Sequence, residues 1–227
     1  LVDDLCRTFE RASANEGWFR QSWLGVEIWQ MPEDMIRLQA IVHAVKPRWI
    51  IETGTKFGGS AIFFSSLLSL CGETQKSEIL TVDLKLHPET LNLFKTHPHG
   101  HRIHTALEGN AADPKIIDQF KTVINHDPGG VIVFLDDNHN AEHVYQELEG
   151  YAPLVSPGSY IIVADTVFAD LAGTPVGQST EKYPDVLRSN PRIAIDRFLD
   201  RNLEFSRAEN PIPYGPSNFR DGFLKRI

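Results

Sequence analysis

Cysteine is scarce in this sequence. The 227 residues include only Cys6 and Cys71, which lie far apart and outside any C-x-x-C pattern. Two isolated cysteines exclude a disulfide scaffold and a thiolate zinc site, and they are typical of a reducing compartment. We therefore expect a cytoplasmic protein.

Long hydrophobic runs are also lacking. The longest, Ala61 to Cys71, is too short to span a bilayer and contains serines. The N-terminus does not show the basic-then-apolar pattern of a signal peptide. We expect no membrane partner.

Basic clusters are absent as well. Lys and Arg number 22 against 30 Asp and Glu, which gives a net charge of -8. Phosphate contacts need clustered Lys and Arg, so nucleic acid is not an expected partner. The hydrophobic content of 41% is enough to bury a full core in one domain, with or without an extension.

Short apolar runs alternate with helix-like segments from Arg48 onward. This alternation is typical of βαβ units, and it predicts a doubly wound, mostly parallel, Rossmann-like α/β sheet. The strands that we expect are Trp49–Ile51, Ile79–Val82, Ile103–Ala106, Val131–Leu135 and Tyr160–Val163. Two further strands, Leu203 to Ser206 and Gly222 to Ile227, are separated by turn-forming residues and predict an antiparallel C-terminal edge.

Residues 1–31 read as an extension to a main domain of residues 32–227. A helix is expected around Leu5 to Ser13, followed by an aromatic segment without a clean period: Trp18, Phe19, Trp23 and Trp29. These rings either cap the edge of the core or form a lid over a ligand. The connection Thr166 to Asn190 is longer than usual, and we expect it to lie as a loop over the ligand-binding crevice of the sheet.

The stretch Trp49 to Ser60 predicts a strand, a tight glycine-rich loop and a helix start. Glycines at 54, 58 and 59 let the backbone turn sharply and approach a ligand, and the helix start favours a negative group. The NAD fingerprint would need glycine at Lys56, so an amino-acid-bearing nucleoside suits the pattern better. The expected cofactor-binding residues of this stretch are Glu52, Thr53, Gly54, Thr55, Gly58, Gly59 and Ser60.

An acid ends or closely follows each expected strand: Glu52, Asp83, Glu108, Asp136 and Asp165. The carboxyl ends of parallel strands form the ligand crevice, so these acids are expected at one rim. Asp83 is placed to accept ribose hydroxyls. Glu108, Gly109 and Asn110 offer a second acid and a backbone that can pass close to an adenine ring.

The strongest chemical cluster starts at Asp136 and runs into a helix. If the strands before Asp136 and Asp165 are neighbours, the two carboxylates suit a hard divalent ion. His139, three residues beyond Asp136, is expected on the same side, and an imidazole there suits the role of a catalytic base. A competing interpretation is an iron site of Asp136, His139 and His143. A plain set of helix-capping residues is the third alternative.

Three stretches, Ile51 to Ser60, Phe134 to His139 and Leu154 to Tyr160, resemble the family of rhamnosyl O-methyltransferases and cephalosporin hydroxylases. The resemblance extends from about Trp23 to the C-terminal Gly222 to Arg226. It implies a class I methyltransferase fold, S-adenosylmethionine (SAM) as methyl donor and a magnesium ion chelated by the acceptor.

Carried over by position, the resemblance makes Asp136 and Asp165 metal ligands and His139 the base. The family often has an acidic pair ending the fifth strand, whereas this sequence has Ala164 as the first member. Asp137, Asn138 or water is then needed to complete the metal shell.

The function predicted is a SAM-dependent O-methyltransferase that acts on a hydroxyl of a small sugar-bearing or specialised metabolite, with magnesium. The alternatives are an NAD(P)-dependent oxidoreductase or hydroxylase on the same fold, and a catalytically inactive SAM-binding protein. A homo-oligomer is left open.

Overall fold

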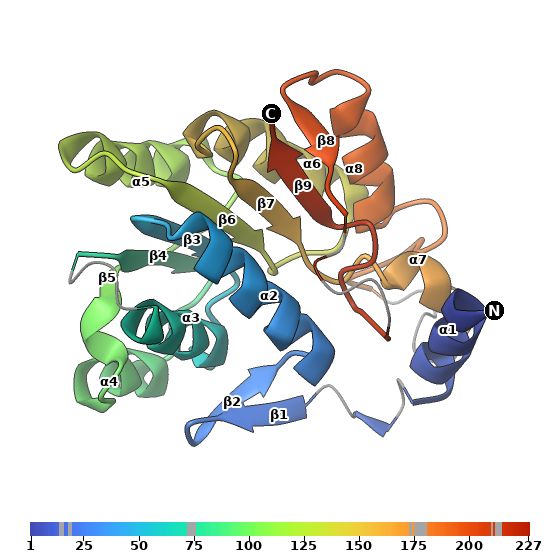
Figure 1. The fold of residues 1–227 in the computed structure, drawn as a ribbon, viewed down its shortest axis with the longest axis horizontal. Coiled ribbons are helices and arrows are strands. Elements are labelled where there is room, and N and C mark those ends of the chain that lie inside the picture. Colours follow the sequence, from blue (N-terminus) through green and yellow to red (C-terminus); the bar gives the residue numbers. More distant parts are fainter. Residues whose placement is uncertain are drawn as a thin grey trace.

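The computed structural model describes residues 1–13, 16–17, 20–71, 76–172, 174, 181–209, 211 and 215–227. Its centre is a seven-stranded sheet in the order β5-β4-β3-β6-β7-β9-β8 (Figure 1). The strands are β3 (Trp49–Thr53), β4 (Glu78–Asp83), β5 (Ile103–Glu108), β6 (Val131–Leu135), β7 (Tyr160–Val163), β8 (Phe205–Arg207) and β9 (Phe223–Arg226). The first five are parallel, whereas β9 pairs antiparallel with β7 and with β8. The predicted doubly wound sheet with an antiparallel edge is confirmed.

Helices cover both faces of this sheet (Figure 1). The helices are α2 (Pro32–Val45), α3 (Gly59–Leu70), α4 (Pro88–Thr96), α5 (Pro114–His126), α6 (Ala141–Tyr151) and α8 (Pro191–Leu199). Successive strand residues point to opposite faces. Ile51 therefore packs in one core cluster with α5, α6 and α8, and Ile50 packs in the other with α2 and α3. Two buried faces explain why the strands read as continuous apolar runs.

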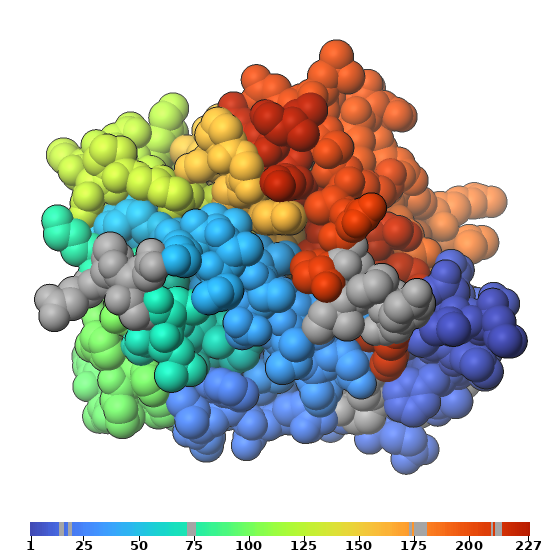
Figure 2. All heavy atoms as spheres, in the orientation of Figure 1, coloured from blue at the N-terminus to red at the C-terminus, as the bar shows by residue number. Residues whose placement is uncertain are grey.

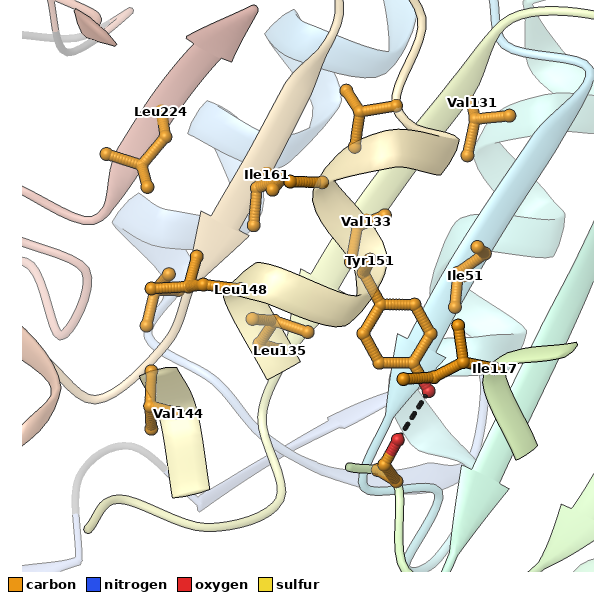
Figure 3. Close-up of a cluster of buried hydrophobic side chains, with 14 of the residues drawn as sticks. Ile51, Ile117, Val131, Val133, Leu135, Val144, Leu148, Tyr151, Ile161 and Leu224 are labelled. Carbon is orange, nitrogen blue, oxygen red and sulfur yellow. Dashed lines mark hydrogen bonds between the residues drawn. The ribbon is translucent and has the colours of Figure 1, made fainter. Parts of the chain in front are cut away.

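The helix α6 is held firmly against the sheet. In Figure 3, Leu148 of this helix lies near Leu135 and Ile161 of the strands, and Val144 belongs to the same buried cluster. The Tyr151 hydroxyl at the end of α6 donates a hydrogen bond of 2.9 Å to the Ala111 carbonyl. The helix α6, which follows the loop that carries the Asp136 cluster, is thus anchored to the sheet and to the segment before α5.

The N-terminal segment packs onto the rest of the chain. It contains α1 (Val2–Ser13) and a hairpin of β1 (Arg20–Trp23) and β2 (Val26–Trp29), which the aperiodic aromatic pattern did not predict. Glu10 of α1 is buried and accepts hydrogen bonds from the Ser217 backbone and the Arg220 side chain. In Figure 2, atoms of the C-terminal region (red) lie beside α1 (dark blue). Trp18 and Phe19 lie outside the described residues.

The connection after β7 is not a plain loop. It begins with the short helix α7 (Phe168–Leu171), which corrects the expectation of a loop from Thr166 to Asn190. Residues 173 and 175–180 of this connection lie outside the described residues. Among the residues that are described, no helix is long and apolar enough to cross a membrane.

The turn after β3 lies against the turn after β6, backbone to backbone. Thr53 is paired with Leu135, and the Asp136 amide donates to the Thr53 carbonyl at 3.2 Å. Gly54 has a φ of +86°, and a Cβ added there would lie 2.2 Å from the Asp136 carbonyl oxygen. Only glycine fits at this position, for reasons of both conformation and space.

We predict that Gly54→Ala destabilises the protein more than Gly158→Ala does. Gly158 also has a positive φ, +79°, but an added Cβ there meets nothing within 4 Å. The left-handed conformation costs about 1–2 kcal/mol at either position. Gly54→Ala must also displace the Asp136 backbone, so we expect a total loss of about 3–4 kcal/mol in urea unfolding. Equal losses of unfolding free energy in the two variants would show that the Asp136 backbone leaves room for a Cβ at position 54.

Candidate active site

A cavity of about 560 Å³ opens at the carboxyl ends of the parallel strands. Its walls come from the glycine-rich turn, the N-terminal hairpin, the turns after β4, β6 and β7, and the segment at 182–183. The predicted site residues that line it are Gly54, Thr55, Gly59, Ser60, Asp83, Asp136, Asp137, His139 and Asp165. The predicted residues that do not line it are Glu52, Thr53, Gly58, Glu108, Gly109 and Asn110.

Glu52 points into the protein, contrary to the expectation that it belongs to an open rim. Its side chain is fully buried and accepts a hydrogen bond of 2.6 Å from Thr81, which is itself bonded to Thr55. Burial raises the pKa of Glu52 to about 7, against the lowering effect of hydrogen bonds from Ser60 and Thr81. Through Thr81, Glu52 is therefore linked to Thr55 of the glycine-rich turn, and it supports this turn from the protein interior.

Gly58 and Gly59 have structural roles that the sequence did not reveal. An added Cβ at Gly58 would lie 2.7 Å from the Phe94 ring of α4, and one at Gly59 would lie 2.1 Å from the Glu27 carbonyl of β2. The Cβ position of Gly58 thus faces α4, and Gly58 is not among the residues that line the cavity. Gly59 lets the hairpin pack directly on the start of α3.

The turns after β4 and β5 support each other. Asp83 lines the cavity, and its carboxylate accepts hydrogen bonds from the backbone amides of Lys56 at 2.8 Å and Lys85 at 3.3 Å. Glu108 is exposed and accepts from the Leu86 amide at 3.0 Å. The Gly109 amide donates to the Asp83 carbonyl at 2.8 Å, so the predicted adenine-side residues brace the Asp83 turn.

Asp136, His139 and Asp165 come together, as the sequence predicted. Each offers one ligand atom within 4.8 Å of the others, and His139 Nε2 lies 3.1 Å from Asp165 Oδ2. Asp136 accepts a hydrogen bond of 2.6 Å from the Gln30 amide. Burial raises the pKa of Asp136 well above its usual range, and the charges of neighbouring acids such as Asp165 add to this.

This group fits a divalent cation. Two carboxylates at the cavity wall repel each other, and a cation between them relieves that repulsion. Magnesium takes oxygen ligands, binds through one or two carboxylates and keeps several waters. Position 164 contributes nothing, because Ala164 is buried in the core cluster against α2 and α3.

Aromatic rings hold His139 in place. Its ring lies 4.9 Å from the Phe168 ring and is stacked on Tyr183 at 5.6 Å between centroids. Together with the Asp165 contact, these neighbours fix the orientation of the imidazole at the cavity wall. A histidine fixed in this way is suited to proton transfer.

Asp137 belongs to a different group. His143 Nε2 lies 3.0 Å from Asp137 Oδ2 and 3.7 Å from Glu147 Oε2. The iron site of Asp136, His139 and His143 is therefore not assembled, because His143 faces Asp137. Asp137 is therefore grouped with His143 and Glu147, and not with Asp136, His139 and Asp165. Burial raises the pKa of Glu147 well above its usual range, with the Asp137 charge as the next cause.

Sequence reasoning missed Gln30 and Lys56 as cavity residues, whereas Trp29, for which a lid over a ligand was one of two interpretations, does line the cavity. Lys56 Nζ lies 3.1 Å from the centroid of the Trp29 ring. Burial lowers the pKa of Lys56, against the raising effect of the Asp136 charge. Lys56 has a φ of +43°, a conformation that favours glycine. Its position between the glycines of the turn was the one sequence feature that could have indicated a cavity residue.

Comparison with known proteins identifies relatives of this chain. A family model described as Rhamnosyl O-methyltransferase/CmcI matches residues 15–227. The rhamnosyl O-methyltransferase of Mycobacterium tuberculosis (strain ATCC 25618 / H37Rv) is 32% identical over 214 residues, which are 92% of this chain and 79% of that protein. The rhamnosyl O-methyltransferase of Mycobacterium leprae is 30% identical over 159 residues, which are 70% of this chain and 65% of that protein.

Solved structures of more distant sequence share the fold. A CmcI structure with Mg and SAM has a TM-score of 0.61 at 15% identity, over 91% of this chain and 76% of that one. The O-methyltransferase TomG from Streptomyces achromogenes, in complex with SAM, has a TM-score of 0.55 at 15% identity, over 88% and 80% of the two chains. The fold is thus that of class I SAM-dependent methyltransferases.

We predict that Glu52→Gln stabilises the protein at pH 8 more than at pH 5. Glu52 keeps its proton in the folded state up to about pH 7, whereas in the unfolded chain it ionises near its ordinary value of 4.5. The unfolded state therefore releases its proton first, and the free energy of unfolding falls as pH rises through this window.

Glutamine removes this loss, so we expect a gain of about 1–3 kcal/mol at pH 8 that fades toward pH 5. Urea unfolding at the two pH values measures the difference. Glu108→Gln, at the exposed end of β5, is the control and should change little. A pH-independent effect of Glu52→Gln would contradict the protonated state.

Proposed function

This chain belongs to the rhamnosyl O-methyltransferase/CmcI family, and from that premise we propose that it transfers a methyl group from SAM to a hydroxyl of a small sugar-bearing or specialised metabolite. One observation carries the proposal: a single cavity joins the glycine-rich turn and Asp83 to the Asp136, His139 and Asp165 group. A nicotinamide oxidoreductase or hydroxylase and an inactive SAM-binding protein are the alternatives that the experiments below separate.

We call the part of the cavity beside the glycine-rich turn after β3 the donor half, because we propose that SAM binds there. Asp83 is proposed to accept the ribose hydroxyls, and Ser60 at the start of α3 to receive the methionyl carboxylate, where free amides favour a negative group. Thr55 and Gly54 form the floor between them. The predicted residues outside the cavity wall, Glu52, Thr53, Gly58, Glu108, Gly109 and Asn110, are proposed to shape these turns.

Asp136 and Asp165 are the proposed magnesium ligands. A bound magnesium ion would orient the acceptor's oxygens and stabilise negative charge on them. Asp165 is proposed to serve both the ion and His139, with Oδ2, 3.1 Å from His139 Nε2, on the imidazole and Oδ1 on the ion. With Ala164 in place of an acid, water and the acceptor itself are left to complete the shell, and we expect weak, readily exchanged metal.

His139 is the proposed base. A neutral imidazole that donates from Nε2 to Asp165 keeps its lone pair on Nδ1. Nδ1 then takes the proton of the acceptor hydroxyl as the oxygen forms its bond to the methyl carbon and SAM leaves as S-adenosylhomocysteine. Asp165 stabilises the imidazolium that results. Positioning supplies much of the rate in such a displacement.

Residues 1–31 are proposed to act as the wall and lid of the acceptor half, with residues 32–227 as the catalytic domain. The hairpin brings Trp29 to the cavity, which Phe168 and Tyr183 of the connection after β7 also line. Aromatic faces of this kind suit the apolar face of a sugar ring. The hairpin also supplies Gln30, which holds Asp136.

We predict that SAM and S-adenosylhomocysteine raise the melting temperature and that NAD does not, because only a ligand that binds the folded state stabilises it. Asp83→Asn should weaken S-adenosylhomocysteine binding at least about tenfold, since one charged hydrogen-bond acceptor is lost. Calorimetry measures both effects. Asp118→Asn, exposed on α5, is the matched control. Stabilisation by NAD alone would favour the oxidoreductase.

We predict that Asp136→Asn and His139→Ala slow methylation of a synthetic rhamnoside while S-adenosylhomocysteine affinity changes little. Loss of a general base costs about a hundredfold to ten-thousandfold, and for His139→Ala the loss should shrink as rising pH ionises the acceptor. His126→Ala, exposed at the end of α5, is the control.

The metal is tested separately in the unmodified protein. Chelation should stop turnover, and added magnesium should restore it. Full activity after exhaustive chelation would reject the metal role and leave His139 as the only proposed group. Donor binding without turnover under all conditions would identify an inactive SAM-binding protein.

A further inference from the structure

A second group of potential metal ligands lies beside the proposed magnesium site. Asp137 comes from the turn after β6, and His143 and Glu147 come from α6. Each of the three offers one ligand atom within 4.8 Å of the others. His143 and Glu147 are four residues apart, so they share one face of the helix. Asp137 and His143 also line the cavity, which gives an ion a path to the group.

Glu147 is the unusual member. It is fully buried, and neither of its carboxylate oxygens has a hydrogen-bond partner of good geometry among the described residues. Its polar neighbours are the side chains of His143, Asp137 and Thr53. A buried carboxyl without a hydrogen bond of good geometry is costly, and natural proteins pair such groups or use them to bind a ligand. The methyl-transfer mechanism proposed above does not use Glu147 or His143.

The spacing of the group suits a small divalent ion. His143 Nε2 lies 3.0 Å from Asp137 Oδ2 and 3.7 Å from Glu147 Oε2. Ligands about 2.0–2.1 Å from a tetrahedral zinc ion are roughly 3.3–3.5 Å apart. One imidazole nitrogen with two carboxylate oxygens is a donor set for zinc or another first-row transition metal, whereas magnesium prefers oxygen alone.

We propose that Asp137, His143 and Glu147 form a second cation site, distinct from the Asp136, His139 and Asp165 group, that takes a first-row transition-metal ion such as Zn²⁺. The fourth ligand position faces the cavity through Asp137 and His143. The ion joins the start of α6 to the turn that carries Asp136, the residue next to Asp137. It is thus a positioning site for the proposed magnesium ligand.

The test is a titration of the tag-free full chain with Co²⁺ in excess Mg²⁺. Excess Mg²⁺ competes for the Asp136 and Asp165 carboxylates, and the visible absorption of Co²⁺ reports a mixed nitrogen and oxygen environment. Because each group holds one histidine and two acids, the variants below decide which group binds Co²⁺. We expect one equivalent of Co²⁺ to bind, and Zn²⁺ to displace it. His143→Ala and Glu147→Gln should each weaken Co²⁺ binding at least about tenfold.

His139→Ala and Asp165→Asn are the matched variants of the neighbouring group and should leave Co²⁺ binding unchanged. His143 is partly exposed, so His143→Ala is expected to keep its fold even if Glu147→Gln does not. Circular dichroism checks this.

Loss of Co²⁺ binding in the Asp165 variant but not in the His143 variant would place the ion in the first group. Absence of Co²⁺ binding to the folded protein would mean that the three side chains form only a hydrogen-bonded network. Either result overturns the second site. Neither affects the proposed methyl transfer, which is read from SAM binding and turnover.

Discussion

The parallel pairing of β3 with β6 is the constraint on which the site depends. It sets Thr53 against Leu135, so that the two chains leave the sheet side by side. Gly54 then allows the two turns to touch through their backbones. The glycine-rich turn, which is proposed to hold the donor, and the turn with Asp136, which is proposed to hold the acceptor, are thereby fixed at one distance. In-line transfer between two bound molecules requires such a fixed relation.

Acidic side chains are concentrated at this edge of the sheet. Asp136 lies near Asp165, Glu52 and Asp137, and all three raise its pKa. Each of three acids has a nitrogen-bearing side chain beside it. The Gln30 amide donates to Asp136, His139 contacts Asp165, and His143 contacts Asp137. Lys56 adds an ammonium group at the cavity wall. Where carboxyl groups gather like this, a bound cation is often the largest local charge and stabilises the arrangement of the acids.

Much of this arrangement could be predicted from the sequence. The buried strands are unbroken apolar runs, and an acid after each of them is a local pattern, so the sheet and the meeting of Asp136 with Asp165 followed. The direction of a strand-end side chain is not a local property. Glu52 and Asp136 both come at the end of apolar runs, yet Glu52 turns to Thr81 inside the protein.

The residues that sequence reasoning missed depend on tertiary contacts. Gln30 reaches Asp136 across 106 positions of the chain, and no spacing rule relates them. The hairpin that carries Gln30 has strands of four residues each, too short to establish a period. Whether Asp137 faces Asp136 or His143 is decided by the first turn of α6. Lys56 in a left-handed conformation breaks a local preference, and such departures cluster at functional sites.

The central claim is that this cavity moves a methyl group from SAM to a hydroxyl oxygen. The most direct measurement is mass spectrometry of a rhamnoside after incubation with the protein, magnesium and SAM that carries a trideuterated methyl group. The account predicts a product heavier by one trideuteromethyl group on oxygen, with S-adenosylhomocysteine formed in equal amount. A product that gains an oxygen atom or loses hydrogen, with no deuterium transferred, would contradict it.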